Sequence, residues 1–89
     1  MNPASGSDAL FLSESHRLES ITATTHDDRE FRQLVDWCFD VANLSDAMAA
    51  CSENGQHIMR ITLPASDDRL RAFGRKVEDS TVWTVERWS

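Results

Sequence analysis

Histidine, aspartate and serine side chains that could do chemistry fall in two short segments of this sequence. The first segment is His26, Asp27 and Asp28, whose imidazole and carboxylate groups suit a zinc or manganese ion. Carboxylates at this spacing also suit the positive end of a helix, where they cap free backbone N–H groups. We prefer the capping interpretation and expect no metal site and no cofactor.

The second segment surrounds Asn54-Gly55. Ser52 and His57 flank this pair, and across a tight turn they would be cross-strand neighbours, as a nucleophile and its base must be. The sequence indicates no third residue to orient the histidine and no oxyanion site, so we interpret them as a polar pair at the end of a hairpin. The neighbouring Cys51 is expected to be a small buried side chain. Without a catalytic motif, we expect a protein that is not an enzyme.

Asn54-Gly55 is itself the strongest hairpin signal in the chain, because both residues tolerate the positive φ of a type I′ turn. The strands are expected over Ala47–Cys51 and His57–Leu63. Their register would place one apolar set on a single face, namely Met48, Ala50, Met59, Ile61 and Leu63. A competing interpretation takes Ser45 as a helix cap and residues 46–52 as a short helix, because alanine is a poor strand former.

The elements on either side of the hairpin alternate between strand and helix. Residues 17–24 are rich in Ile and Thr and predict a strand. Thr25 and Asp28 have capping-box spacing, and a helix should follow them. Its apolar residues recur at steps of three and four, namely Phe31, Leu34, Val35, Cys38, Val41 and Ala42. A shorter helix is expected after its cap Ser66, and a last strand over residues 81–87.

This order predicts an α+β fold, a ferredoxin-like βαββαβ sandwich in which two helices cover one face of a four-stranded antiparallel sheet. Residues 1–16 are expected to be a flexible N-terminal tail, and residues 17–89 a single α+β domain. Three apolar side chains would lie on the helix-free face. We expect these three residues, Ile58, Val82 and Trp88, to form an interface.

Length and charge narrow the classes of partner. The 89 residues allow one core with a thin margin of stability. There are 15 acidic and 9 basic residues, and the net charge of -6 argues against direct nucleic-acid binding. No segment approaches the roughly 18 apolar residues of a membrane span, so no membrane association is expected. Cys38 and Cys51 lack a CxxC partner and are expected to be reduced thiols in a cytoplasmic protein.

The stretch from Val41 to Leu63, VANLSDAMAACSENGQHIMRITL, resembles the ACT domain, in particular the small regulatory subunits of acetolactate synthase. In that pattern an Asn and an aliphatic residue open the second strand, and an Asn-Gly-type turn leads into the third. The resemblance extends loosely over residues 17–88. It implies an effector amino acid bound where the first strand meets the first helix, often across a dimer interface. The corresponding residues here are His26, Asp27 and Asp28, with Asn43 and Leu44 at the start of the second strand.

Two functions of different classes follow from these observations. The first is a non-catalytic regulatory or effector-binding module that acts as a small subunit or homodimer, with an amino acid as its small effector. The alternative is an acidic inhibitor or immunity-type protein that binds and blocks a macromolecular partner, which a charge of -6 would suit. Both functions predict a protein partner or self-association.

Overall fold

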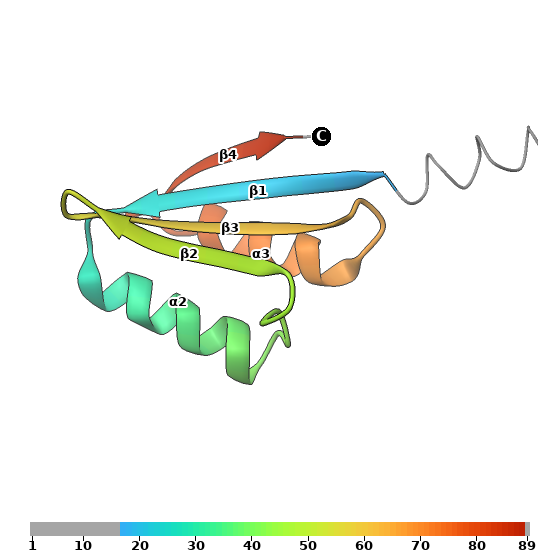
Figure 1. Cartoon of the computed structure of the whole chain (residues 1–89), viewed down its shortest axis with the longest axis horizontal. Helices are drawn as coiled ribbons and strands as arrows, with labels where there is room; N and C mark the ends of the chain where they lie inside the picture. The colour runs from blue at the N-terminus through green and yellow to red at the C-terminus, as the bar shows by residue number, and fades with distance from the viewer. Residues whose placement is uncertain (1–16, 89) are drawn as a thin grey trace, which may run out of the picture.

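The computed structural model describes residues 17–88, so the prediction of a flexible tail over residues 1–16 lies outside the described part of the chain. Six elements follow one another along it (Figure 1). They are β1 (Leu18–Thr25), α2 (Asp28–Asp40), β2 (Met48–Glu53), β3 (Gln56–Pro64), α3 (Asp68–Glu78) and β4 (Thr84–Trp88).

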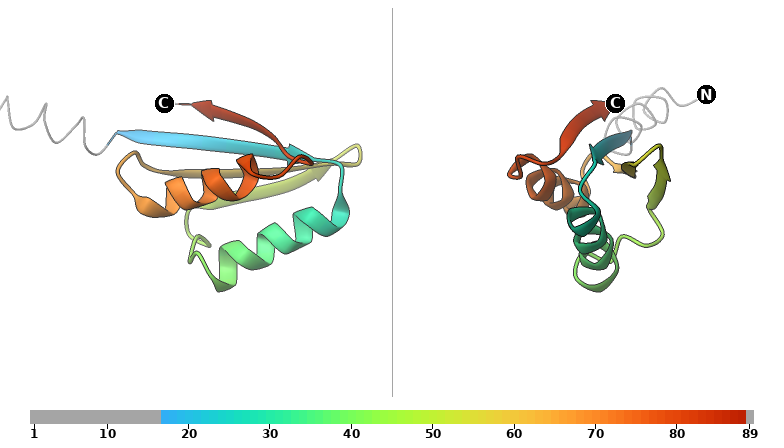
Figure 2. Two further views of the ribbon diagram at one scale, coloured as in Figure 1. Left: turned by 180° about the vertical axis from the view of Figure 1, so that it is seen from behind. Right: turned by 90° about the vertical axis from the view of Figure 1, so that its left-hand side faces the viewer.

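The four strands form one antiparallel sheet in the order β2-β3-β1-β4, with β1 and β3 at its centre. Both helices lie on the same face of this sheet, as the end-on view in Figure 2 shows. The opposite face carries no helix among the described residues. The predicted α+β, ferredoxin-like βαββαβ fold is therefore confirmed.

The hairpin between β2 and β3 has the predicted register. Ser52 lies opposite His57, and Glu53 lies opposite Gln56. Asn54 and Gly55 have φ angles of 54° and 79°, the left-handed values that a two-residue turn of this kind requires. The competing interpretation, a short helix over residues 46–52, is wrong, because this segment pairs with β3.

The first helix begins later and ends earlier than the spacing predicts. Thr25 stays in β1, where its hydroxyl accepts a hydrogen bond from the backbone N–H of Asp27 at 3.1 Å. Asp27 is the N-cap instead, and its carboxylate accepts from the N–H of Glu30 at 2.9 Å. The helix ends at Asp40, so Val41 leaves the apolar stripe and is 71% exposed.

The second helix and the last strand also start later than expected. Asp67, not the serine before it, is the N-cap of α3, and its carboxylate accepts from the N–H of Arg69 at 2.9 Å. The strand β4 begins at Thr84 because the preceding segment bends. The backbone N–H of Val82 donates to the Ser80 hydroxyl at 3.3 Å, which holds that bend before strand pairing starts.

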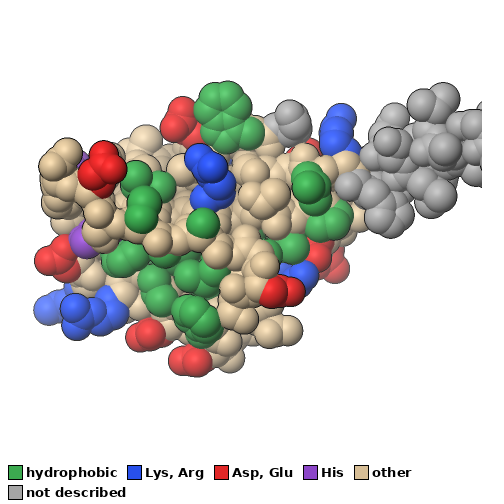
Figure 3. Space-filling model, viewed as in Figure 1, with side chains coloured by type: hydrophobic (Ala, Val, Ile, Leu, Met, Phe, Trp, Pro, Cys, Tyr) green, Lys and Arg blue, Asp and Glu red, His purple; other side chains and the backbone are tan. Residues whose placement is uncertain are grey.

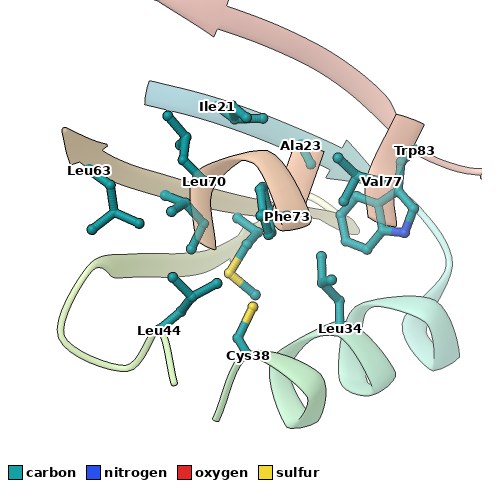
Figure 4. Close-up of a cluster of buried hydrophobic side chains, with 12 residues drawn as sticks. Ile21, Ala23, Leu34, Cys38, Leu44, Leu63, Leu70, Phe73, Val77 and Trp83 are labelled. Carbon is teal, nitrogen blue, oxygen red and sulfur yellow. The ribbon is translucent and has the colours of Figure 1, made fainter. Parts of the chain in front are cut away.

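The core lies between the sheet and the two helices (Figure 4). Its buried hydrophobic residues come from β1, α2, β3, α3 and two loops, namely Ile21, Ala23, Leu34, Cys38, Leu44, Met59, Ile61, Leu63, Leu70, Phe73, Val77 and Trp83. Ala50 shares the face of Met59 but is exposed, because β2 is an edge strand. No helix within residues 17–88 is long and apolar enough to cross a membrane.

Candidate functional site

The hairpin places Ser52 and His57 on the helix side of the sheet, at the edge where the chain turns. The two residues are direct cross-strand partners. Their side chains meet at 2.6 Å between Ser52 Oγ and His57 Nδ1. This contact is the nucleophile and base arrangement that the spacing makes conceivable.

A third residue completes a chain of hydrogen bonds. Asp28, in the first turn of α2, places Oδ1 at 2.5 Å from Nε2 of His57. An ionised carboxylate only accepts, so in the neutral form of the imidazole the Nε2–H group is the donor to Asp28. The Nδ1 atom is then an acceptor, and the hydroxyl of Ser52 donates a hydrogen bond to it. The order of donors is Ser52 to His57 to Asp28.

The imidazole of His57 is held in place from one side by an aromatic ring. Phe31 of α2 stacks on it with a centroid separation of 4.4 Å and an interplanar angle of 7°. The side chain of His57 is only 14% exposed, whereas that of Asp28 is 84% exposed. Packing therefore fixes the base, and the hydrogen-bonded chain remains open to solvent at its acidic end.

A shallow cavity of about 400 Å³ lies beside the hydrogen-bonded residues His57 and Asp28, on the α2 side. Its lining combines apolar and charged groups, contributed by Asp28, Phe31, Arg32, Val35 and His57. Figure 3 shows hydrophobic side chains gathered between β2 and α2, with a histidine at one end of the band. The volume is within the range of small-molecule sites.

The structure does not bring together the five residues of the predicted effector site. His26, Asp27 and Asp28 lie at the start of α2, whereas Asn43 and Leu44 follow its end. The 13 residues of the helix separate the two groups by about 20 Å. Leu44 is fully buried in the core, so its side chain offers no surface to a ligand.

Several of these residues make structural contacts instead. His26 is exposed and its Nδ1 donates to the carbonyl of Gly55 at 3.3 Å, which ties the β1–α2 loop to the hairpin turn. Asp27 caps α2, and Asp28 pairs with His57. Asn43 has a φ of 55°, and its carbonyl accepts from Arg69 Nη1 at 2.7 Å.

A second candidate site is the face of the sheet that the helices leave uncovered. Strand pairing arranges its side chains in three rows across the sheet. One row is Trp88, Ser20 and Thr62; the next is Glu86, Thr22, Arg60 and Ala49; the third is Thr84, Thr24, Ile58 and Cys51. We call these eleven residues the open sheet face. It carries one acid and one base among small, hydroxyl and apolar side chains.

Two pairs of polar side chains on the open sheet face are hydrogen-bonded to each other. The hydroxyls of Ser20 and Thr62 share a hydrogen bond of 2.8 Å. Arg60 donates through Nε to the Thr22 hydroxyl at 3.2 Å, and Thr22 is only 7% exposed although no helix covers it. A polar group that already has a partner within the surface loses little when a binding partner displaces its water.

The three residues predicted as an interface lie in different places. Ile58 and Trp88 belong to the open sheet face, in its outer rows, and Trp88 is 60% exposed. Val82 precedes β4 and is 40% exposed. It lines a separate open depression with residues of the β1–α2 loop. Cys51 is exposed on the open sheet face, so the expectation of a buried side chain is wrong.

Asp28 and Phe31 are the partners of His57 that the sequence analysis missed. They lie far from His57 along the chain, so no short-range spacing joins the three residues. The fold does supply a signal. In a βαββαβ fold the end of the first strand and the hairpin between the second and third strands lie at the same end of the sheet. The start of the first helix must therefore lie beside the hairpin residues. Within residues 17–88, no group of three His, Cys, Asp or Glu side chains is arranged to hold a metal.

No protein-family model and no curated protein matches this chain. Among solved structures, the chain is similar to the uncharacterized protein TM1266 from Thermotoga maritima, with a TM-score of 0.58 and 16% sequence identity. The match covers 80% of this chain and 92% of that one. At this identity the similarity concerns the fold alone.

Proposed function

We propose that this chain is a regulatory module that acts by association through the open sheet face, first of all with a second copy of itself. The observation that carries the proposal is the four-stranded sheet with helices on one side only. Sheets of this kind commonly pack face to face, with the two inner faces forming a common core. A cytoplasmic location, which its free thiols favour, belongs to the same proposal.

The charges of the open sheet face suit a symmetric pair. In a two-fold interface the same patch meets itself, so each charged residue needs an opposite charge elsewhere on the same patch. Arg60 and Glu86 flank Thr22 in the middle row and supply this complementarity. Trp88 and Ile58 add apolar surface on either side of that row. Aromatic residues and arginine are enriched in protein interfaces.

An amino-acid effector remains part of this proposal, in keeping with the ACT-like pattern. We place its site at the edge where β1 meets α2. There Thr25, His26, Asp27 and Val82 line an open depression of about 390 Å³. Thermal unfolding with and without branched-chain and other amino acids tests this part. A higher midpoint in the presence of one of them supports it, and unchanged midpoints with all of them contradict it.

The alternative function, an acidic inhibitor of a basic partner, gains no specific support from the charge distribution of the described residues. The acids of α2 alternate with Arg29 and Arg32, so this helix presents both signs of charge. A mimic of a polyanion needs a surface of one sign. We therefore place association through the open sheet face first.

Sedimentation velocity of the purified chain and two variants tests the association. The wild type should sediment as a dimer, and Trp88→Glu should sediment as a folded monomer because it adds a charge to the interface. Val41→Glu is the matched control, since Val41 is an exposed apolar residue outside the sheet. A wild type that is monomeric throughout the micromolar range overturns the proposal, as does a Trp88→Glu variant that remains dimeric.

A further inference from the structure

We propose that Ser52 is an activated nucleophile that takes acyl groups from esters of small apolar carboxylic acids. This activity goes beyond association and uses the opposite side of the sheet. It stands on the hydrogen-bonded chain of Ser52, His57 and Asp28, with separations of 2.6 Å and 2.5 Å. A serine hydroxyl is a weak nucleophile until an adjacent base removes its proton, and an imidazole that a carboxylate orients is the usual base.

The arrangement supplies each element of that chemistry from a different part of the fold. The turn sets Ser52 directly opposite His57. The first turn of α2 supplies Asp28, and Phe31 stacks on the imidazole and prevents its rotation. In serine proteases the serine faces Nε2 and the aspartate Nδ1. Here the two ring nitrogens are exchanged, and either nitrogen of an imidazole can accept a proton.

The adjoining cavity indicates the class of substrate. His57, but not Ser52, lines this cavity, and its apolar residues Phe31 and Val35 suit a hydrocarbon acyl chain held beside the imidazole. Arg32 lines the same cavity, so its positive charge is the one available there to the oxyanion of a tetrahedral intermediate. The lining therefore favours an ester whose acyl group is apolar.

Hydrolysis of the ester through an acyl-serine requires water as its only co-reactant. Ser52 Oγ bonds to the carbonyl carbon while its proton passes to Nδ1 of His57. The ester C–O bond then breaks, and His57 returns the proton to the departing alcohol. Water, deprotonated by the same nitrogen, attacks the acyl-serine, and the carboxylic acid leaves as Ser52 regains its proton. Asp28 is a positioning residue, because it touches His57 and not the reacting atoms.

Two measurements on the full chain test the nucleophile. Incubation with a fluorophosphonate, in which Ser52 Oγ displaces fluoride from phosphorus, should add one phosphonyl group, and peptide mass spectrometry should place it on Ser52. Hydrolysis of p-nitrophenyl butyrate should be slowed by about 100-fold or more in Ser52→Ala. Ser45→Ala removes an exposed serine from the loop before β2 and should retain both activities. Far-ultraviolet circular dichroism verifies that each variant is folded.

Variants of the neighbouring residues separate a positioned triad from chance imidazole catalysis. Asp28→Asn should lower kcat much more than it changes KM, because it alters the orientation of the base and keeps the apolar lining of the cavity, Phe31 and Val35. His57→Gln should abolish labelling of Ser52. Asp40→Asn removes an exposed carboxylate at the other end of α2 and should have no effect. Val41→Glu should also be fully active, because Val41 is exposed beyond the end of α2.

Two results overturn this proposal. The first is a hydrolysis rate in Ser52→Ala equal to that of the wild type. The second is a wild-type chain that neither takes up the fluorophosphonate nor hydrolyses the ester above the rate of the His57→Gln variant. Neither result bears on association, which sedimentation measures independently.

Discussion

Cys38 contributes a titratable thiol to the hydrophobic core, where none of its surface is exposed. Burial raises the pKa of this thiol to about 11, and the charge of Lys76 only partly opposes the increase. A thiol that stays protonated is a poor nucleophile, so Cys38 should be inert in the folded protein. The exposed Cys51 is then the one thiol of the described residues open to reagents.

The raised pKa of Cys38 predicts a loss of stability in alkali. In the unfolded chain this thiol ionises at its ordinary value of 9.0, so the unfolded state releases a proton that the folded state retains. The stabilising contribution is complete below about pH 9 and is lost as the pH rises toward 11. Urea unfolding at about pH 8 and about pH 10, followed by tryptophan fluorescence, measures the decrease.

Two variants identify the group responsible for that decrease. The chain has no tyrosine, which leaves few other groups that titrate in this range. Cys51→Ser should retain the alkaline loss, and Cys38→Ala should show a smaller one, although its stability at about pH 8 is lower because of the cavity. An equal alkaline loss in Cys38→Ala would mean that another group is responsible.

At the scale of the elements, Gly74 shows how a helix adapts to the sheet beneath it. A Cβ atom at this position in α3 would lie 2.6 Å from Arg87 Nη2 and 3.2 Å from Ile21 Cδ1. Arg87 is held there by Glu78, to which it donates from Nε at 3.0 Å and from Nη2 at 2.8 Å. This ion pair holds the pKa of the Glu78 carboxyl below its ordinary value. Glycine at this point lets α3 approach β1 and β4.

We expect Gly74→Ala to bring no gain in stability. Alanine favours a helix over glycine by up to about 1 kcal/mol. Against this, the Arg87 guanidinium and Ile21 must shift, which weakens the ion pair with Glu78, so the pKa of Glu78 should rise toward its ordinary value. The exposed Ala72→Gly in the same helix is the matched control and should cost about 1 kcal/mol in chemical denaturation. A full gain of about 1 kcal/mol in Gly74→Ala would show that the space around this residue is open.

The elements that sequence predicts well are those whose signal is local. Asn54 and Gly55 determine the hairpin because their positive φ angles are a property of these two residues. Helix starts are less well determined, since Thr25 and Asp27 are both good caps and only the length of β1 selects the second. The contact of His57 with Asp28 and Phe31 depends on the packing of α2 against the hairpin edge, which no local spacing encodes.

At the scale of the whole molecule, the two faces of β3 should respond differently to truncation. Met59 is fully buried beneath the helices, whereas Ile58 points to the open sheet face and is partly exposed. Met59→Ala should lower the free energy of unfolding by about 2 to 5 kcal/mol, because it leaves a cavity in the core. Ile58→Ala should chiefly weaken association and leave the monomer folded. Urea unfolding at low protein concentration compares the two.

Equal large losses in both variants would mean that the open sheet face is covered within the monomer. That outcome would contradict the two-layer arrangement on which association depends. A small loss for Ile58→Ala, together with weaker dimerisation in sedimentation, agrees with it.

The rate at which a maleimide alkylates Cys51, measured as a function of protein concentration, tests the central claim most directly. Cys51 is exposed and lies beside Ile58 in the open sheet face, while the buried Cys38 does not compete. If two chains meet through this face, the rate constant for Cys51 should fall as the protein concentration rises through the dimerisation range. In Trp88→Glu it should stay at the monomer value. A wild-type rate constant that is the same at every concentration, in a sample that sediments as a dimer, would show that the chains associate elsewhere.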